Sequence, residues 1–129
     1  MLIVDDDSDH LLLTRAWLGK DGHNILTAIH VRDAFELLAS RRVDVVVSDQ
    51  NMPEMSGVEF LRRVKLMYPH IVRIMLSGAD DAVTAIAAIN EGEVHKFFVK
   101  GRDDELLRRE IIRKLRHASG LPYRHSQAD

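Results

Sequence analysis

The stretch that decides the fold lies at residues 43–49 and reads VDVVVSD. It is almost continuously apolar and β-branched, and it ends in an acidic residue, Asp49. A strand with one face in solvent would place a polar residue at every second position. This stretch does not, so we expect a strand that is buried on both faces, as in a parallel sheet with helices on its two sides.

Similar apolar runs recur along the chain, and longer segments separate them. The predicted strands are Leu2–Val4, Asn24–Ala28, Val43–Ser48, Ile71–Leu76 and His95–Val99. Between them the apolar residues recur at the helical period. Strand and helix alternating in this way predict a single α/β domain, doubly wound, with three α/β/α layers.

The segments between the strands carry apolar stripes that predict which side chains face the sheet. The predicted core positions are Leu13, Thr14, Trp17 and Leu18 in the first helix, Phe60, Leu61, Val64 and Met67 in the third, Ala82, Ala85, Ile86 and Ile89 in the fourth, and Leu107, Ile111 and Leu115 in the last. Pro69 is expected to end the third helix, and Gly92 to cap the fourth in a left-handed conformation. The acidic residues 103–105 favour the positive end of the last helix.

The composition is that of one soluble globular domain. The 129 residues are 46% hydrophobic and 29% charged, with a net charge of −2. No strong field or long apolar run indicates a nucleic-acid or membrane partner. The absence of cysteine excludes disulfides, thiolate metal sites and cysteine nucleophiles. We expect a cytoplasmic protein.

One domain is expected over residues 1–117, followed at 118–129 by a tail or the start of a linker to an output domain. Gly120, Pro122 and mixed polar residues in this last segment are typical of a chain end or linker. The first predicted strand is short, as it would be if residues preceded Met1.

Polar side chains follow four of the predicted strands. They are Asp5, Asp6 and Asp7 after the first strand, Asp49 after the third, Ser77 after the fourth and Lys100 after the fifth. In open parallel sheets, chemistry gathers at this carboxyl edge. We assign Asp7, with Ser8, to the start of the first helix, where such residues cap the chain.

The remaining side chains suit a phosphate pocket. Crowded carboxylates repel one another unless a cation lies among them, and Mg²⁺ prefers hard oxygen ligands. An ammonium and a hydroxyl opposite that cation would bind phosphoryl oxygens. Asp49 would then be a carboxylate nucleophile. Each residue alone is more often a turn former or a solvated surface group, and only their placement on one edge of one sheet favours the site.

These residues also carry a resemblance to a known family. The chain resembles the receiver domain of two-component response regulators from Leu2 to about His117. The matching segments, in this order and at this spacing, are Leu2–Asp7, Val46–Pro53, Met55–Gly57, Met75–Gly78 and Phe97–Lys100.

The resemblance implies a flavodoxin-like sheet of five parallel strands in the order 2-1-3-4-5, with five helices. It implies that Asp49 accepts a phosphoryl group from a partner histidine kinase or a phosphotransfer protein. Asp5 or Asp6, Asp49 and the backbone carbonyl of Asn51 would hold Mg²⁺. Ser77 and Lys100 would bind the phosphoryl oxygens.

The resemblance also implies how the signal leaves the site. Ser77 would move toward the phosphoryl group, Phe97 would turn inward as the switch aromatic, and the face of the fourth helix, fifth strand and fifth helix would change its partner preference. The expected partners are the kinase, a downstream output domain and a second copy of the chain. The segments Arg73–Asp80, Ala88–Gly92 and Phe97–Lys100 resemble receivers that precede cyclic-dinucleotide phosphodiesterase or other signalling domains.

Two positions depart from the family pattern. Lys100 is followed by Gly101 where the family usually has proline. A cis bond without proline costs about 2.5–4 kcal/mol, so we expect a trans bond and a looser loop. The switch residue, Phe97, lacks a hydroxyl group, but phenylalanine is a common alternative at this position.

Two other hypotheses compete with the switch. A haloacid-dehalogenase-like phosphatase would need an acid two residues after the nucleophile, where this chain has Asn51, and a substrate cap. A degenerate receiver would act as a constitutive docking or dimerisation module, but the chain keeps its acids, Ser77 and Lys100. The seven histidines show no metal-binding spacing and are expected at the surface. The chain is therefore expected to be a signalling domain rather than an enzyme.

Overall fold

The computed structural model describes residues 1–118 and contains one sheet of five parallel strands. The strands are β1 (Leu2–Val4), β2 (Leu26–Ala28), β3 (Val45–Ser48), β4 (Val72–Ser77) and β5 (Lys96–Val99). Their order is β2-β1-β3-β4-β5, which confirms the predicted doubly wound topology. The tail predicted over 118–129 lies outside the described residues, apart from Ala118, which belongs to the last helix.

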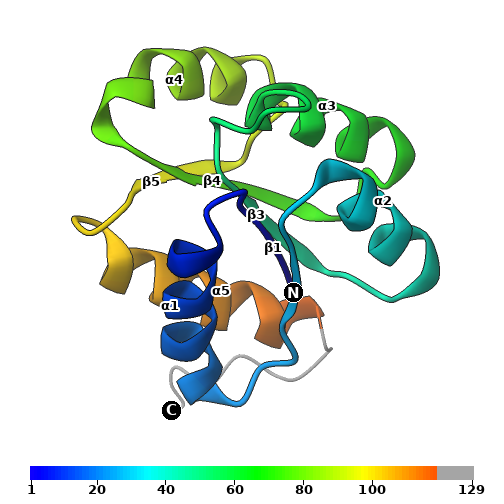
Figure 1. Cartoon of the computed structure of the whole chain (residues 1–129), viewed down its shortest axis with the longest axis vertical. Helices are drawn as coiled ribbons and strands as arrows, with labels where there is room; N and C mark the ends of the chain where they lie inside the picture. The colour runs from blue at the N-terminus through cyan, green and yellow to red at the C-terminus, as the bar shows by residue number, and fades with distance from the viewer. Residues whose placement is uncertain (119–129) are drawn as a thin grey trace.

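Five helices cover the sheet in two layers (Figure 1). They are α1 (Ser8–Leu18), α2 (Val31–Ser40), α3 (Gly57–Met67), α4 (Ala82–Asn90) and α5 (Asp104–Ala118). Two short 3-10 turns, η1 (Gly19–Asp21) and η2 (Ala79–Asp81), follow α1 and precede α4. Helices α1 and α5 lie on one face of the sheet, and α2, α3 and α4 lie on the other.

The alternate faces of each strand supply two separate cores. Toward α2, α3 and α4, the buried side chains include Val46, Phe60, Val64 and Met75. Toward α1 and α5, they include Ile3, Val47, Leu107 and Ile111. Burial on both faces explains why the deciding stretch is apolar at nearly every position.

The predicted helix stripes were correct in part. Thr14, Leu18, Phe60, Leu61, Val64, Ala85, Leu107 and Ile111 are buried as expected. Four predicted core residues are instead exposed to solvent, namely Leu13, Met67, Ile86 and Ile89. In α1 and α4, Leu11 and Ala88 take the buried positions, because the stripe facing the sheet is rotated by about one residue from the predicted one.

Local capping fixes where the helices begin and end. The Asp7 carboxylate accepts hydrogen bonds from the backbone N–H groups of Asp9 and His10, and this confirms its assignment to the start of α1. Ser56 caps α3 in the same way. Helix α3 ends at Met67, before Pro69. Gly92, after α4, has a φ of 77°, a left-handed conformation that favours glycine.

Within residues 1–118, every helix is too short or too polar to traverse a lipid bilayer.

Candidate functional site

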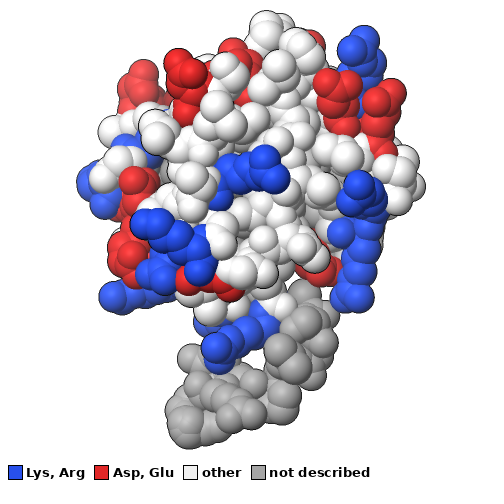
Figure 2. All heavy atoms as spheres, turned by 60° about the horizontal axis from the view of Figure 1, so that its bottom comes forward, with Lys and Arg blue, Asp and Glu red and all other residues white. Residues whose placement is uncertain are grey.

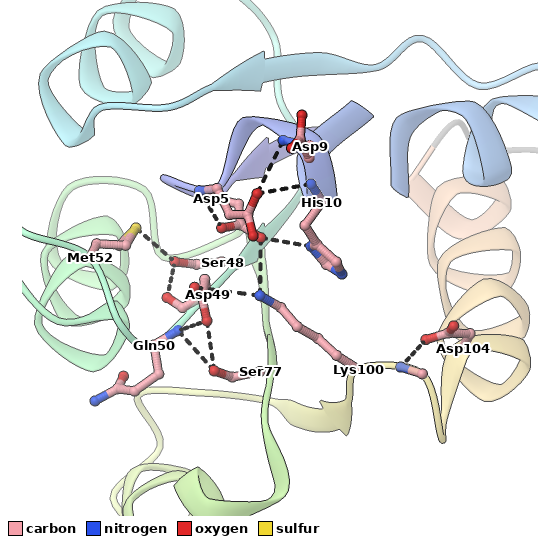
Figure 3. Close-up of polar contacts among 12 residues, drawn as sticks. Asp5, Asp9, His10, Ser48, Asp49, Gln50, Met52, Ser77, Lys100 and Asp104 are labelled. Atoms are coloured by element: carbon pink, nitrogen blue, oxygen red, sulfur yellow. Dashed lines mark hydrogen bonds and ion pairs between the residues drawn. The ribbon is translucent and has the colours of Figure 1, made fainter. Parts of the chain in front are cut away.

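The parallel register brings four strand ends to the same edge of the sheet. Val4 of β1 pairs with Ser48 of β3, and Ser77 of β4 pairs with Val99 of β5. The residues that follow these strands therefore lie together at the carboxyl edge. Figure 3 shows the side chains of Asp5, Asp49, Ser77 and Lys100 converging there.

Asp49 is the buried centre of this group, with 7% of its surface exposed. Its Oδ1 accepts hydrogen bonds from the backbone N–H of Gln50 at 2.7 Å and from the Ser77 hydroxyl at 2.6 Å. Its Oδ2 lies 3.5 Å from the Lys100 ammonium nitrogen. The carboxylate is thus held in one orientation by donors on both of its oxygens.

Asp5 is more deeply buried, with 3% exposed. Its Oδ1 accepts a hydrogen bond from the backbone N–H of Asp7 at 3.0 Å. Its Oδ2 lies 3.2 Å from Lys100 Nζ and 2.8 Å from His10 Nδ1 (Figure 3). Lys100 therefore bridges the two buried acids, and His10 from the first turn of α1 contacts one of them.

Asp6 completes an acidic cluster whose negative charge is not fully compensated. One carboxylate oxygen from each of Asp5, Asp6 and Asp49 lies within 4.8 Å of the others. Partial loss of solvent raises the pKa of Asp6, and the charges of Asp5 and Asp49 raise it further. Three hard oxygen donors at this spacing, with excess negative charge, fit a small divalent cation such as Mg²⁺.

The loop after Asp49 is fixed by a close approach of backbone to backbone. A Cβ atom on Gly57 would lie 2.1 Å from the carbonyl oxygen of Asp49, so only glycine fits there. The Gly57 N–H donates to the Gln50 carbonyl at 2.8 Å, and the Gln50 side chain accepts from the Val58 N–H at 2.9 Å. The start of α3 therefore buttresses the backbone that carries Asp49.

The loop after Lys100 is held by acidic side chains rather than by proline. The Lys100 N–H donates to the Ser77 carbonyl at 2.9 Å. The Asp103 carboxylate accepts from the Val99 N–H, and the Asp104 carboxylate accepts from the Gly101 N–H, both at 2.9 Å. Gly101 has a φ of 80°, again a left-handed conformation. These hydrogen bonds restrain a loop that the sequence alone predicts to be loose.

Residues 1–112 match the response regulator receiver domain family. The chain belongs to this family. The fold and the order of its strands agree with that membership, and so does the acidic cluster beside Asp49.

Individual relatives of this receiver include a regulator and two solved structures. It is 34% identical over 122 residues to the hydrogenase transcriptional regulatory protein HoxA of Cupriavidus necator, covering 94% of this chain and 25% of that protein. It is similar to the signal receiver domain of an HD domain-containing protein from Pseudomonas fluorescens, with 34% identity, a TM-score of 0.82, and coverage of 92% and 95%. It is also similar to the response regulator protein TrrA from Thermotoga maritima in complex with Mg²⁺-BeF, with 26% identity, a TM-score of 0.73, and coverage of 88% and 96%. The chain spans about a quarter of the length of the curated relatives it matches.

The receiver fold places the predicted site residues in two locations. Asp5, Asp6, Asp49, Ser77 and Lys100 meet at the carboxyl edge, as expected. Phe97 lies apart from them, partly buried against the core under α2, α3 and α4. For Asn51, the side-chain amide donates to Asp81 at 3.0 Å.

The sequence analysis did not predict His10 or Asp81 as contributors to the receiver's site, and it named Gly57 only within the matching segment Met55–Gly57 without giving it a role. His10 could have been suspected from its place in the first helical turn after the acidic run. Gly57 could have been suspected from its position at the start of a helix, where glycine is unfavourable without a steric reason. Asp81 was not predicted, because nothing in the sequence shows that its carboxylate turns back toward Ser77, four residues earlier, and its contact to Asn51 depends on how two separate loops meet.

Proposed function

We propose that this receiver is a phosphorylation-controlled signalling switch in which Asp49 accepts a phosphoryl group from a partner histidine kinase or phosphotransfer protein. One observation carries the proposal. A buried carboxylate stands among two further acids, one hydroxyl and one ammonium at the edge of the sheet. A nucleophilic carboxylate and its phosphate-binding partners need this combination.

In the proposed reaction, a carboxylate oxygen of Asp49 forms a bond to phosphorus. The bond between phosphorus and the donor histidine nitrogen breaks, and the nitrogen keeps the electron pair. Lys100, 3.5 Å from Asp49 Oδ2, would neutralise charge on the transferred group. The Ser77 hydroxyl, now on Asp49 Oδ1, would donate to a phosphoryl oxygen instead.

The candidate ligands of Mg²⁺ are Asp5 or Asp6, Asp49 and the backbone carbonyl of Asn51. The acidic cluster and the raised pKa of Asp6 support a cation at this position. When bound, the ion would offset the negative charges of the phosphoryl group and of the acids that surround it. A similar protein, TrrA, has been solved in complex with Mg²⁺-BeF.

The signal would leave through the face formed by α4, β5 and α5. On α4, Val83 is 82% exposed and Ile86 is 56% exposed, although both are apolar. Phe97, partly buried against the core under α2, α3 and α4, would couple the movement of Ser77 to this face. A partner or a second copy of the chain that covers these apolar side chains would bind one state of the switch more tightly than the other.

Helix α1 offers a docking surface for the phosphoryl donor, because it begins at the site. Leu12 and Leu13 are 63% and 71% exposed, which is unusual for adjacent leucines. The side of the molecule that carries α1 and α5 has a mostly uncharged band, with one basic patch near its middle and further charged side chains on its flanks (Figure 2). A partner helix seated there could bring its phosphohistidine to Asp49.

The output is proposed to be a further domain that this receiver controls. The curated relatives are transcriptional regulators, and one structural relative is the receiver of an HD domain-containing protein. The expectation of a cyclic-dinucleotide signalling output stays a prediction.

Labelling with acetyl phosphate tests the proposal. Wild type should gain one phosphoryl group in the presence of Mg²⁺, as measured by intact-protein mass spectrometry, and chelation should prevent it. Asp49→Asn should not be labelled, because it lacks the nucleophile. Asp33→Asn, a matched loss of one acid on α2, should label like wild type. Equal labelling of Asp49→Asn and wild type would refute the assignment.

A further inference from the structure

Asp81 contacts the site from outside the group of residues that would carry out the reaction. It ends η2 and directly precedes α4. Its Oδ2 lies 2.6 Å from the Ser77 hydroxyl oxygen and accepts a hydrogen bond from the Asn51 amide at 3.0 Å. Asp81 therefore joins the loops that follow β3 and β4 to the start of α4.

Two carboxylates compete for one proton at Ser77. The hydroxyl oxygen is 2.6 Å from Asp49 Oδ1 and 2.6 Å from Asp81 Oδ2. Both distances are in the range of strong hydrogen bonds to a charged acceptor, but a hydroxyl group donates only once. Each rival oxygen has another donor, the Gln50 N–H for Asp49 and the Asn51 amide for Asp81. The Ser77 proton is the one that they share.

Helix capping does not explain the contact between Asp81 and Ser77. Aspartate before a helix usually caps it through the side chain. Asp81 holds the cap position of α4, yet its side chain makes no capping hydrogen bond. Among residues 1–117, its side-chain contacts are directed to Ser77 and Asn51.

We propose that Asp81 is a positioning residue that restrains the receiver in its unphosphorylated arrangement by competing for the Ser77 hydroxyl. This inference rests on the proposed function. A phosphoryl group on Asp49 needs the same hydroxyl as a donor, so Asp81 must release Ser77 before the group is fully bound. The negative charge of Asp81 also opposes the negative charge of the incoming group.

Loss of the Asp81 contacts would directly affect the position of α4. The residue is continuous with the first turn of that helix, so loss of its contacts to Ser77 and Asn51 frees the segment that positions it. Phosphorylation and the position of α4 are then coupled through one carboxylate. Weakening this contact should therefore favour binding at the phosphoryl site, because less free energy is then needed to release Ser77.

Binding of beryllofluoride, which imitates an acyl phosphate, measures this restraint. Its affinity in the presence of Mg²⁺ can be determined by fluorine NMR or calorimetry on the full chain. Asp81→Asn should bind about five- to tenfold more tightly than wild type, because the charged competitor is lost while the shape of the side chain is kept. Asp81→Ala should change affinity in the same direction.

Two controls separate the contact from general charge and from folding. Asp80→Asn removes the same charge from the neighbouring residue, which is exposed, and should leave the affinity near that of wild type. In a Ser77→Ala background, Asp81→Asn should have no further effect, because the contested hydroxyl is absent. Thermal unfolding of each variant would verify that it is folded.

The possible results distinguish failure of the Asp81 inference from failure of the proposed function. If Asp81→Asn and Asp81→Ala bind no more tightly than Asp80→Asn, or if their effect persists without the Ser77 hydroxyl, Asp81 does not restrain the switch. If wild type itself binds no beryllofluoride, the proposed function fails, and the inference falls with it.

Discussion

Charged groups lie near both ends of strand β4, and their charges are compensated in different ways. Near its amino end, Arg73 is a buried cation with 3% of its surface exposed. Near its carboxyl end, Ser77 lies beside the acidic cluster of Asp5, Asp6 and Asp49. One end buries positive charge and the other gathers negative charge, only a few residues apart.

The Arg73 guanidinium is held by backbone carbonyl groups. Its guanidinium donates to the carbonyl oxygens of Glu93 at 2.9 Å, Ile71 at 3.0 Å, Gly92 at 3.2 Å and Pro69 at 3.4 Å. Burial lowers the pKa of Arg73, because these dipoles do not fully replace water. The side chain ties the loops around β4 together and has little left to offer a ligand.

The acidic cluster has the opposite balance. Asp5 and Asp49 share one ammonium, and Asp49 shares one hydroxyl with Asp81. A charge that is already surrounded by hydrogen-bonding groups of the backbone serves the fold. A charge that is only partly satisfied leaves free energy to be gained when a cation or a phosphoryl group binds. This difference distinguishes the site from an equally buried structural feature of the same strand.

Replacing the arginine should give the largest effect on stability. Arg73→Leu would leave several buried carbonyl groups without donors, each at a cost of about 1–3 kcal/mol. We expect a loss of about 3 kcal/mol in the free energy of unfolding, measured by urea denaturation, because some carbonyls will regain water. Arg73→Lys should lose less. A change below about 0.5 kcal/mol, the range of ordinary surface substitutions, would mean that the carbonyl contacts are unimportant.

The acidic end should respond to metal instead. At a Mg²⁺ concentration ten times its dissociation constant, wild type should gain about 1.4 kcal/mol in the free energy of unfolding. Asp5→Asn should lose most of this gain, whereas Arg73→Lys should keep it. The measurement is urea denaturation with and without Mg²⁺ at constant ionic strength. An unchanged gain in Asp5→Asn would remove Asp5 from the candidate ligands.

The smallest effect should come from a histidine beside the arginine. His95 Nδ1 accepts a hydrogen bond from the Arg73 N–H at 2.9 Å. Although part of the His95 side chain is exposed, partial desolvation lowers its pKa below the ordinary value of 6.5, and the Arg73 charge lowers it further. The unfolded chain therefore binds the proton more readily than the folded one. The stability from neutral His95 should be present above pH 6.5 and be lost as the pH falls through the lowered pKa.

His95→Asn keeps an acceptor but does not titrate, so it isolates this effect. Its stability should fall less than that of wild type as the pH is lowered from 6.5. Identical pH profiles of thermal unfolding for the two proteins would show that His95 is not protonated differently in the folded state.

The sequence predicted the features that depend on local pattern. Apolar runs identified every strand, although four of them begin one or two residues later than expected, namely Leu26–Ala28, Val45–Ser48, Val72–Ser77 and Lys96–Val99. Strand-end positions identified Asp5, Asp6, Asp49, Ser77 and Lys100, because parallel strands bring their carboxyl ends to one edge. These predictions need only the spacing of apolar residues and the rule that the carboxyl ends of parallel strands lie at one edge of the sheet.

The remaining features depend on tertiary placement. Helix α4 is apolar around most of its surface, so its period could not decide that Ala88 rather than Ile89 would be buried. Asp81 follows Ser77 by four residues in the same loop, but no spacing in the sequence encodes that its carboxylate turns toward Ser77 and meets Asn51 of another loop. Arg73 sits within a predicted strand, but only the surrounding carbonyl groups explain why it is buried.

Gly57 has a consequence for how tolerance to substitution should be interpreted in this protein. Any side chain there would overlap the carbonyl group of Asp49, so a library of variants would be depleted at Gly57 as severely as at Asp49 itself. The two positions would look alike in such a screen. Only one of them carries a reactive group, and the other marks how closely the chain must pass behind it.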